Sequence, residues 1–402
     1  MTASAHAAQS PAEVSAELDE RQHQLRRRLE GLIGIAATEG NEILVLHNGD
    51  EIFPAMLDAI GKAERTIDLV TFIYWKGDIA RAFADALSAQ ARAGVRVRLL
   101  IDAIGGRLLE RALLRQMAAA GVLVEWFRKP WAKSPFKQNH RCHRKVCVVD
   151  ETIAFTGGVG IAEEWCGDAR DETEWRDTHF RIRGPAVDGL SAAFSQNWAE
   201  SGRPMYDDRD TFPEQEQTGH SVVQVVRGSA SIGWDDMQTV FKVFIEAAQH
   251  QLHIATAYFA PDDDFLDLLC AAARRGVDVD VCVPGPYADK RVSRVASQAT
   301  FASLTGCGVG VWAYQPSMLH TKVLTIDGIA AIVGSSNYNR RSLDHDEEVV
   351  LCVINRDVAQ LLDRHFAEDL RRSEPIDPSR WENRPLTQRA AEAVVTPIRR
   401  WL

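Results

Sequence analysis

Two short segments of the chain combine the same reactive side chains in the same order. The first contains His143 and Lys145, and the second contains His320 and Lys322. On a β-strand, side chains two residues apart point to the same face, so each histidine and its lysine can contact one ligand. A histidine can attack or transfer a proton, and a lysine can bind an anion, which together favour chemistry at a phosphate group.

The two segments repeat over a longer window. His320 follows His143 by 177 residues (320 − 143). The same separation relates the aspartates and glycines that come next, Asp150 to Asp327 and Gly157 to Gly334. Repetition at a fixed separation is typical of duplicated structural units. We therefore expect two related halves that each contribute one motif to a single composite active site.

Four acidic residues are candidates for the carboxylates that support this chemistry. Asp150 and Asp327 end apolar strands with the opposite parity to the histidines, so we expect them to fix turns or local networks. Asp177 and Glu348 each begin an alternating, strand-like run, which favours them as the groups that orient the imidazoles. A carboxylate that accepts a proton from one imidazole nitrogen selects the tautomer and supports a positive or covalently modified ring.

Small residues follow each motif where the predicted strand ends. Gly157 and Gly158 follow the first strand, and Ser335 and Asn337 follow the second. A glycine turn lets a ligand approach backbone N–H groups closely, and hydroxyl and amide side chains add donors. Together with two lysines, this array matches the oxygens of a phosphodiester. We predict that these four residues bind a substrate phosphate.

The doubled pattern of histidine, lysine, aspartate and glycine resembles the phospholipase D superfamily. The flanking sequences resemble its bacterial cardiolipin synthase branch, and the similarity runs from about residue 40 to the end of the chain. The segments that carry it are 139–145, 155–158, 175–177, 334–337 and 341–343.

The resemblance implies a covalent mechanism. One histidine, for which we take His143, attacks phosphorus to form a phosphohistidine, and His320 protonates the departing alcohol and then deprotonates the incoming one. Two phosphatidylglycerol molecules would yield cardiolipin and glycerol, without a metal or another cofactor. The predicted catalytic set, from the residues and the resemblance together, is His143, His320, Lys145, Lys322, Asp150, Asp327, Asp177 and Glu348.

The sequence departs from the family in two respects. Gly160 stands where the second half has Asn337 and where the family commonly has asparagine in both halves. The first half therefore lacks one amide donor. Membrane-spanning segments, which need about 18 continuous apolar residues, are also absent, so the chain resembles a shorter, peripheral form.

Three functions remain open from the sequence. Transfer of a phosphatidyl group between lipids is favoured by the flanking sequences. Hydrolysis uses the same phosphohistidine with water as the acceptor, and its substrate would be a phospholipid or, less readily, a nucleic acid. The third function is lipid binding by a protein that has lost its activity, which the presence of both histidines and both lysines disfavours.

The order of predicted elements indicates an α/β fold. A strand at 67–74, a helix at 79–93 and a strand at 95–101 recur as 252–259, 265–274 and 277–283. Strand–helix–strand units predict two similar mixed, mostly parallel sheets flanked by helices and related by pseudo-twofold symmetry. The expected division is an N-terminal helical or disordered extension (1–32), a first half (33–205), a linker (206–219), a second half (220–372) and an amphipathic C-terminal tail (373–402).

Composition narrows the choice of partner and compartment. The formal charge is −10. This balance disfavours a broad basic face for nucleic acid, so no nucleic-acid partner is expected. The seven cysteines are scattered and odd in number, several within apolar runs, which favours buried thiols and a reducing compartment. We predict a cytoplasmic protein, peripheral to the inner face of the cytoplasmic membrane, with anionic phospholipids of the phosphatidylglycerol type as substrates.

Two segments are candidates for contact with the membrane. Between residues 128 and 145 basic residues are interleaved with aromatic ones and no acidic residue occurs. Basic groups near a bilayer attract anionic lipid, and tryptophan favours the headgroup zone. The predicted membrane-facing residues are Arg128, Lys129, Trp131, Lys133, Phe136 and Lys137. The tail from Trp381 to Leu402 either lies in the interface or packs against the body.

Overall fold

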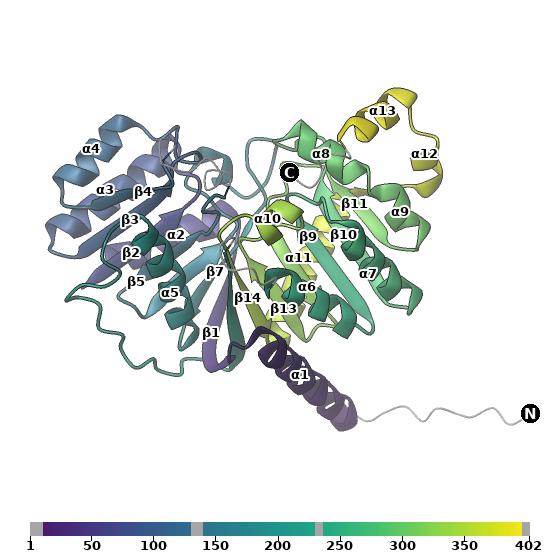
Figure 1. The fold of residues 1–402 in the computed structure, drawn as a ribbon, viewed down its shortest axis with the longest axis horizontal. Coiled ribbons are helices and arrows are strands. Elements are labelled where there is room, and N and C mark those ends of the chain that lie inside the picture. The colour runs from purple at the N-terminus through teal and green to yellow at the C-terminus, as the bar shows by residue number, and fades with distance from the viewer. Residues whose placement is uncertain (1–10, 130–139, 230–235, 396–402) are drawn as a thin grey trace, which may run out of the picture.

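The computed structural model describes residues 11–129, 140–229 and 236–395. Two similar α/β halves lie side by side, with the N-terminal helix below the second half in the view of Figure 1. The first half contains β1 (Thr38–His47), α2 (Asn48–Gly61), β2 (Thr66–Thr71), α3 (Asp78–Arg92), β3 (Arg96–Asp102), α4 (Arg111–Ala119), β4 (Leu123–Phe127), β5 (Val146–Val149), β6 (Ile153–Gly157), the 3₁₀ turn η2 (Glu163–Trp165), β7 (Thr178–Arg183) and α5 (Ala186–Glu200).

The second half repeats this order with small additions. It contains β8 (Ser221–Gly228), α6 (Asp236–Ala247), β9 (Gln251–Thr256), α7 (Asp263–Arg274), β10 (Asp278–Pro284), α8 (Arg291–Gln298), α9 (Phe301–Gly306), β11 (Gly310–Tyr314), β12 (Lys322–Ile326), β13 (Ala330–Gly334), α10 (Arg340–Asp344), β14 (Glu348–Ile354) and α11 (Arg356–Arg371). The chain begins with α1 (Pro11–Ile33) and ends with β15 (Ser373–Pro375), α12 (Pro378–Glu382) and α13 (Leu386–Val395).

All the described strands form one sheet of 15 strands. The first half contributes the order β4-β3-β2-β5-β6-β7-β1, and the second half contributes the matching order β11-β10-β9-β12-β13-β14-β8 with β15 at its edge. The halves join where β1 pairs with β8. The identical strand orders confirm the duplication predicted from the sequence, but the two sheets are fused and not separate.

The sheet is mixed, as predicted, but it is not mostly parallel. The predicted strand–helix–strand units are present and parallel, in β2–β3 and β9–β10. Of the fourteen pairings in the described sheet, however, ten are antiparallel and four are parallel. The prediction was wrong because the chain following each motif returns through short hairpins, such as β5–β6, which pair strands antiparallel without a crossover helix.

Apolar contacts hold the halves together and attach the N-terminal helix. One buried cluster includes side chains from both halves, among them Val45 and Phe180 from the first and Val353 and Leu362 from the second. Helix α1 packs through Leu25, Leu29 and Ile33 against the core of the second half. Both faces of the sheet are thereby covered, which suits its continuously apolar strands.

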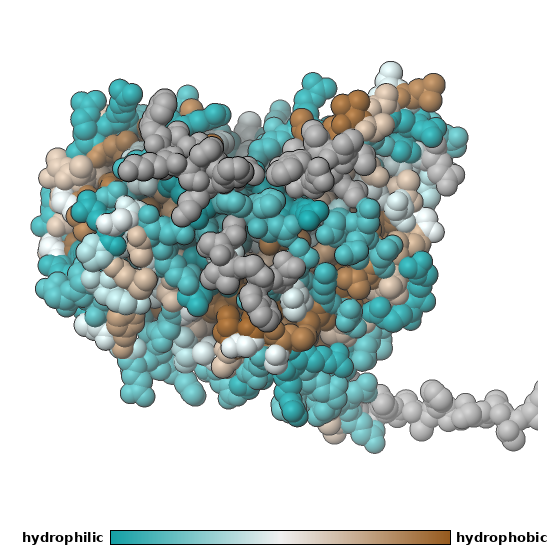
Figure 2. Space-filling model, in the orientation of Figure 1, coloured by the Kyte–Doolittle hydropathy of each residue, from teal (hydrophilic) through white to brown (hydrophobic). Residues whose placement is uncertain are grey.

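The C-terminal segment is built onto the second half. Strand β15 pairs antiparallel with β11, and the ring of Trp381 in α12 lies 5.0 Å from that of Phe301. Helix α13 follows Pro385 and leaves Leu386 and Val394 78% and 74% exposed. Figure 2 shows hydrophobic surface at the upper right, where Figure 1 places α13. Every helix in the described ranges is too short or too polar to cross a membrane.

One cysteine pair differs from the prediction of scattered thiols. Cys270 in α7 and Cys307 after α9 form a disulfide, with Cα atoms 5.4 Å apart. The sequence separation of 37 residues carries no recognisable pairing pattern, so the contact depends on the packing of α7 against α9. The other described cysteines are free, and those at 142, 147, 282 and 352 are buried as expected.

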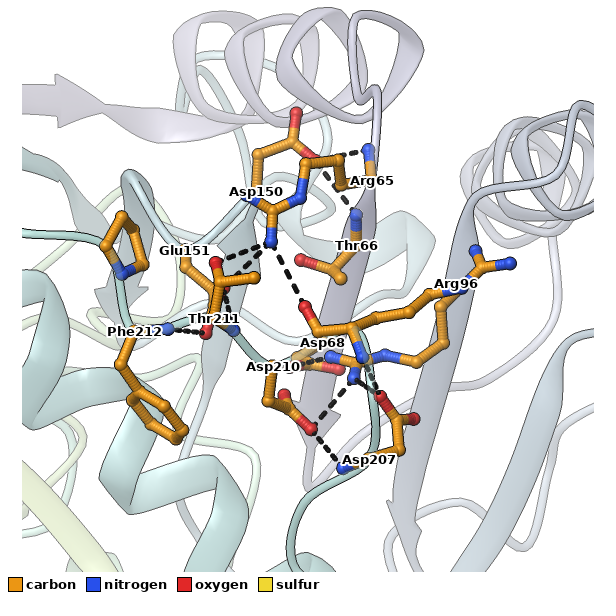
Figure 3. A network of polar contacts seen from close by, with 12 residues as sticks. Arg65, Thr66, Asp68, Arg96, Asp150, Glu151, Asp207, Asp210, Thr211 and Phe212 are labelled. Atoms are coloured by element: carbon orange, nitrogen blue, oxygen red, sulfur yellow. Dashed lines mark hydrogen bonds and ion pairs between the residues drawn. The ribbon is translucent and has the colours of Figure 1, made fainter.

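A polar network fastens the linker to the first half. Figure 3 shows Asp68 on β2 beside Arg96 on the adjacent strand β3, and Arg98 lies on the same strand. Asp68 accepts two hydrogen bonds of 2.6 Å from Arg98, and the two arginines continue outward to Asp207 and Asp210 of the linker. Asp68 and both arginines are buried. The linker is thus fixed to the first half through two buried arginines and the buried carboxylate of Asp68.

The central carboxylate of this network provides a stability test. Asp68→Ala leaves Arg98 buried without its bidentate partner, so the free energy of unfolding should fall by about 3 kcal/mol. Asp58→Ala breaks an exposed pair with Lys62 and should cost less than about 0.5 kcal/mol. Urea denaturation of both variants measures the difference. Equal losses would contradict the structural role of the network.

Candidate active site

The motif histidines lie where segments of the two halves cross. His143 lies just before β5, which begins at Val146. Its backbone N–H donates to the carbonyl of Glu347 in the second half at 2.9 Å. His320 precedes β12, and its N–H donates to the carbonyl of Arg176 in the first half at 2.7 Å. Each histidine is therefore held in place by backbone from the opposite half. Both motifs occupy the edge where the parallel strands end, the common location of sites in α/β sheets.

Each imidazole contacts a carboxylate from the opposite half. Nδ1 of His143 lies 2.8 Å from Oε1 of Glu348, and Nδ1 of His320 lies 2.7 Å from Oδ2 of Asp177. With these acceptors, Nδ1 carries the proton in each neutral ring and Nε2 keeps its lone pair. Asp177 and Glu348 thus orient the histidines, as the strand-like runs predicted. The exchange of carboxylates between the halves makes the site composite.

The two lysines complete a buried cluster. The amino group of Lys145 donates to the carbonyl of His143 at 2.8 Å. The amino group of Lys322 lies 3.0 Å from Nδ1 of His320 and also contacts the carbonyl of that residue. All four motif side chains are buried. The structure therefore brings both His-x-Lys motifs to the same place, as predicted.

Burial sets the charge state of this cluster. It lowers the pKa of His143 to about 4 and that of His320 to about 3, so both rings are neutral at neutral pH. Burial also lowers the pKa of Lys145 to about 8 and that of Lys322 to about 7. A neutral imidazole beside a carboxylate has the lone pair that attack on phosphorus needs.

The two supporting carboxylates stay ionised because the neighbouring histidines and lysines outweigh the effect of burial. Burial alone would raise the pKa of Asp177, but the adjacent His320 and Lys322 outweigh it and lower that pKa. The pKa of Glu348 is lowered in the same way by His143 and Lys145. At neutral pH the site thus places two carboxylates beside Lys145, which is mostly charged, and Lys322, which is partly charged, before any substrate binds. No cluster of three or more metal-ligating side chains occurs within the described ranges.

Aromatic rings surround the two histidines unequally. Trp165, Trp175 and Tyr258 have ring centroids within 5.0, 5.4 and 6.2 Å of His320. The indole N–H of Trp165 also donates to Oδ2 of Asp177 at 2.8 Å. Near His143 the ring contact is Phe72, at 5.2 Å. No pattern in the sequence indicates Trp165, because the residue 177 positions later is Ser342 and the repeat does not extend to it.

Gly158 and its counterpart Ser335 contact the carboxylates that orient the histidines. A Cβ at Gly158 would lie 2.2 Å from Oδ1 of Asp177, so only glycine leaves room for that carboxylate. The equivalent Ser335 donates its hydroxyl to Glu348. The N–H groups of Gly158 and Ser335 donate to Thr178 and Val349 carbonyls. In the structure these two residues position the acids, and phosphate binding by them stays a prediction.

The other two loop residues have different surroundings. A Cβ at Gly157 would meet His179 and the backbone of β7 within 2.7 Å, so this glycine allows close strand packing. Asn337 donates to the hydroxyl of Ser342 at 3.4 Å, and its buried side-chain oxygen has no partner among the described residues. Phosphate binding by Gly157 and Asn337 stays a prediction.

The missing asparagine of the first half has a steric explanation. A Cβ at Gly160 would lie 2.8 Å from Cβ of Ile73 and 3.2 Å from the ring of Trp165. Trp165 occupies the position equivalent to Ser342, the partner of Asn337. The asparagine–serine pair of the second half is thus replaced by a glycine–tryptophan pair, whose indole contacts Asp177.

The motif aspartates lie at the far ends of their strands. Asp150 accepts hydrogen bonds of 2.7–2.9 Å from the N–H groups of residues 64, 65 and 66. Asp327 accepts equivalent bonds of 2.7–2.9 Å from residues 249, 250 and 251. Both fix turns, as strand parity predicted. Their place in the catalytic set is therefore corrected, since neither contacts a motif histidine or lysine.

The structure describes two of the six residues that were predicted to face the membrane, and one of these two is held in ion pairs. Arg128 bonds to Glu200 at 2.9 Å and to Glu347 at 3.1 Å, and its side chain is 12% exposed. It joins the halves, so its prediction as a membrane-facing residue was wrong. Lys129 is exposed, with its amino group 3.9 Å from Glu125. The remaining members, Trp131, Lys133, Phe136 and Lys137, lie outside the described residues.

The buried lysines predict a pH profile. They bind phosphate only when charged, so kcat/KM for a phosphodiester should fall as pH rises through their pKa values of about 7 and about 8. On the acid side, activity should persist down to the histidine pKa values of about 4 and about 3. Initial rates across this range test the profile. A decline that begins only near the usual lysine pKa of about 10 would contradict it.

Comparison with known proteins gives consistent matches. The family model described as "Cardiolipin synthase, PLD-like domain" matches residues 56–183 and 241–370. The cardiolipin synthase of Geobacillus kaustophilus is 34% identical over 88% of this chain and 71% of that protein. Cardiolipin synthase 1 of Bacillus cereus is 30% identical over 95% of this chain and 76% of that protein.

Solved structures agree on the fold. The phosphatidylserine synthase of Haemophilus influenzae superposes with a TM-score of 0.70 at 13% identity, covering 94% of this chain and 100% of that one. The polyphosphate kinase of Porphyromonas gingivalis superposes with a TM-score of 0.56 at 15% identity, covering 84% of this chain and 49% of that one. Because the family model spans more than half of the sequence and both halves carry the motif geometry, the chain belongs to the cardiolipin synthase family with phospholipase D-like domains.

Proposed function

We propose that the protein is a phosphatidyltransferase that converts two phosphatidylglycerol molecules into cardiolipin and glycerol. The observation that carries the proposal is the pair of buried, neutral histidines, each supported by a carboxylate from the opposite half. The names of the curated relatives supply the substrate class. The geometry itself supports chemistry at a phosphodiester.

The first half-reaction transfers the phosphatidyl group to the protein. His320 is neutral in the free site and takes up a proton from solvent as the anionic substrate binds. Nε2 of His143 then attacks phosphorus, and the bond from phosphorus to the glycerol oxygen breaks as the protonated His320 gives its proton to that oxygen. Lys145 and Lys322 stabilise the charge on the non-bridging oxygens. The bound phosphate raises the proton affinity of His320 and keeps the lysines charged, since an adjacent anion favours protonated groups.

The second half-reaction releases the product. The hydroxyl of a second phosphatidylglycerol gives its proton to His320 while its oxygen attacks phosphorus. The phosphorus–nitrogen bond to His143 then breaks and cardiolipin leaves. The protonated His320 finally releases its proton to solvent, so both histidines are neutral again. Water in place of the second lipid would give phosphatidic acid, so the hydrolase alternative differs only in the acceptor.

Product analysis tests the reaction. Purified protein incubated with phosphatidylglycerol vesicles should form cardiolipin and free glycerol, detected by mass spectrometry. His143→Ala and His320→Ala should each lose at least ~10³-fold in rate, as expected for a nucleophile and a proton-transfer group. Formation of phosphatidic acid alone would mean that water is the acceptor and that the protein is a hydrolase. Full activity in either variant would favour a different site.

Trapping separates the roles of the two histidines. Labelled phosphatidylglycerol should leave an adduct on His320→Ala protein and none on His143→Ala protein. The opposite pattern would exchange the two roles without changing the reaction.

We propose further that the protein binds the membrane peripherally through the edge that carries the site. Exposed apolar side chains follow the parallel strands or lie on the helices beyond them in both halves. They are Ile104 and Leu108 in the first half and Tyr287, Val292, Leu386 and Val394 in the second. Apolar side chains that project from one edge favour insertion into the headgroup zone. The predicted cytoplasmic location at the inner face remains part of this proposal.

Vesicle binding tests this orientation. Leu386→Ser combined with Val394→Ser should weaken binding to phosphatidylglycerol vesicles about tenfold, since two exposed apolar side chains are lost from the proposed contact. Leu32→Ser is the matched control, because Leu32 is 56% exposed on α1, away from the site edge. Vesicle co-sedimentation measures both. An equal effect of the two changes would argue against this edge.

A further inference from the structure

A cavity of about 320 Å³ lies beside the active site in the second half. It lies beyond the ends of β9, β10 and β11 and is bounded by α8 and the start of the C-terminal segment. One wall is apolar and includes Pro284, Phe301, Ile376 and Trp381. The charged residues that line it are Lys290, Arg294 and Glu374. Small-molecule sites commonly have this size and this mixture of apolar walls with few polar groups.

The cavity reaches the catalytic cluster through one side chain. Tyr258 lines the cavity, and its ring lies 6.2 Å from that of His320. The hydroxyl of Tyr258 donates to Asp289 at 2.7 Å, and the amino group of Lys290 lies 4.7 Å from the centre of the same ring. Tyr258 therefore lies both in the wall of the cavity and beside His320.

The equivalent space in the first half is filled. Strand registers make Ala257 the counterpart of Phe72 and Ala313 the counterpart of Trp126. Both alanines line the cavity. Phe72 and Trp126 instead pack against the Gly105–Gly106 turn, where an added Cβ would lie 3.0 Å from each ring. Two large-to-small differences thus open in one half a volume that is closed in the other.

Polar groups at the N-cap of α8 and on α8 itself line this volume and have no ion-pair partner among the described residues. Among the described residues, neither Lys290 nor Arg294 forms an ion pair with a carboxylate; Arg294 contacts the carbonyl of Pro286 at 3.4 Å. The hydroxyl of Ser297 lines the cavity, is buried and has no hydrogen-bond partner in the described structure. Ser297 itself is 6% exposed. An unsatisfied buried hydroxyl beside two unpaired cations indicates an anionic ligand with oxygen acceptors.

We propose that this cavity binds one of the two lipid substrates, as an anionic glycerophospholipid whose phosphate contacts Lys290 and Arg294. The chain next to the headgroup packs against the wall formed by Phe301 and Trp381. The glycerol headgroup reaches past Tyr258 towards His320, the residue that exchanges protons with the alcohol in the proposed reaction. The assignment of a reacting lipid rests on the proposed function, whereas the binding site itself does not.

Direct binding tests the site without turnover. His143→Ala protein is titrated by calorimetry with dihexanoyl phosphatidylglycerol below its micelle concentration. Lys290→Gln combined with Arg294→Gln should weaken binding at least about tenfold, because two cations are removed. Ala313→Trp, which introduces the first-half residue, should abolish binding in the cavity. Arg291→Gln on the same helix is the control, since Arg291 is exposed and does not line the cavity.

The outcomes separate this site from its alternatives. Unchanged affinity in both the Ala313→Trp and the double glutamine variant would overturn the proposal and assign lipid binding to the catalytic lysines alone. Equal affinity for glycerol 3-phosphate would overturn the lipid assignment in favour of a free phosphate ester. A protein that binds lipid with the expected variant pattern but makes no cardiolipin would keep the site and refute the synthase reaction.

Discussion

The exchange of carboxylates between halves is the constraint on which the rest of the structure depends. His143 is oriented by Glu348, and His320 by Asp177, so neither half contains a complete catalytic pair. Carboxylates buried this deeply are stable only when hydrogen-bond donors are held against them in a fixed geometry. Two buried arginines supply that rigidity across the boundary: Arg144 donates to the carbonyl of Glu348, and Arg176 pairs with Asp369 at 2.9 Å.

Within this frame the two halves have diverged. Gly158 makes room for one acid, whereas Ser335 donates a hydrogen bond to the other. Gly160 allows Trp165 to reach Asp177, in place of the asparagine and serine found in the second half. Such differences give the two histidines unequal surroundings, with three rings beside His320 and the ring of Phe72 beside His143. Unequal surroundings suit two steps that make unequal demands on the same pair of groups.

The sequence predicts what is local or repeated. The duplicated halves follow from the 177-residue separation, and strand parity separates Asp150 and Asp327 from Asp177 and Glu348. Features that occur in only one half cannot be predicted from the repeat. Trp165 has no counterpart, the Cys270–Cys307 contact depends on helix packing, and the burial of Arg128 depends on Glu347 from the other half. The antiparallel pairings are also hard to predict, because short hairpins leave a weaker sequence pattern than crossover helices.

The linker between α5 and β8 joins the two halves in one polypeptide, so each half can be substituted independently of the other. In a symmetric assembly of separate halves, any substitution would appear at both histidines at once, so a change useful to one step would be imposed on the other. Here the halves are one polypeptide, and residues 207–212 are hydrogen-bonded to β3 and to Glu151. Each half can therefore acquire mutations on its own, and a glycine such as Gly160 can be inherited in one copy while the other retains Asn337.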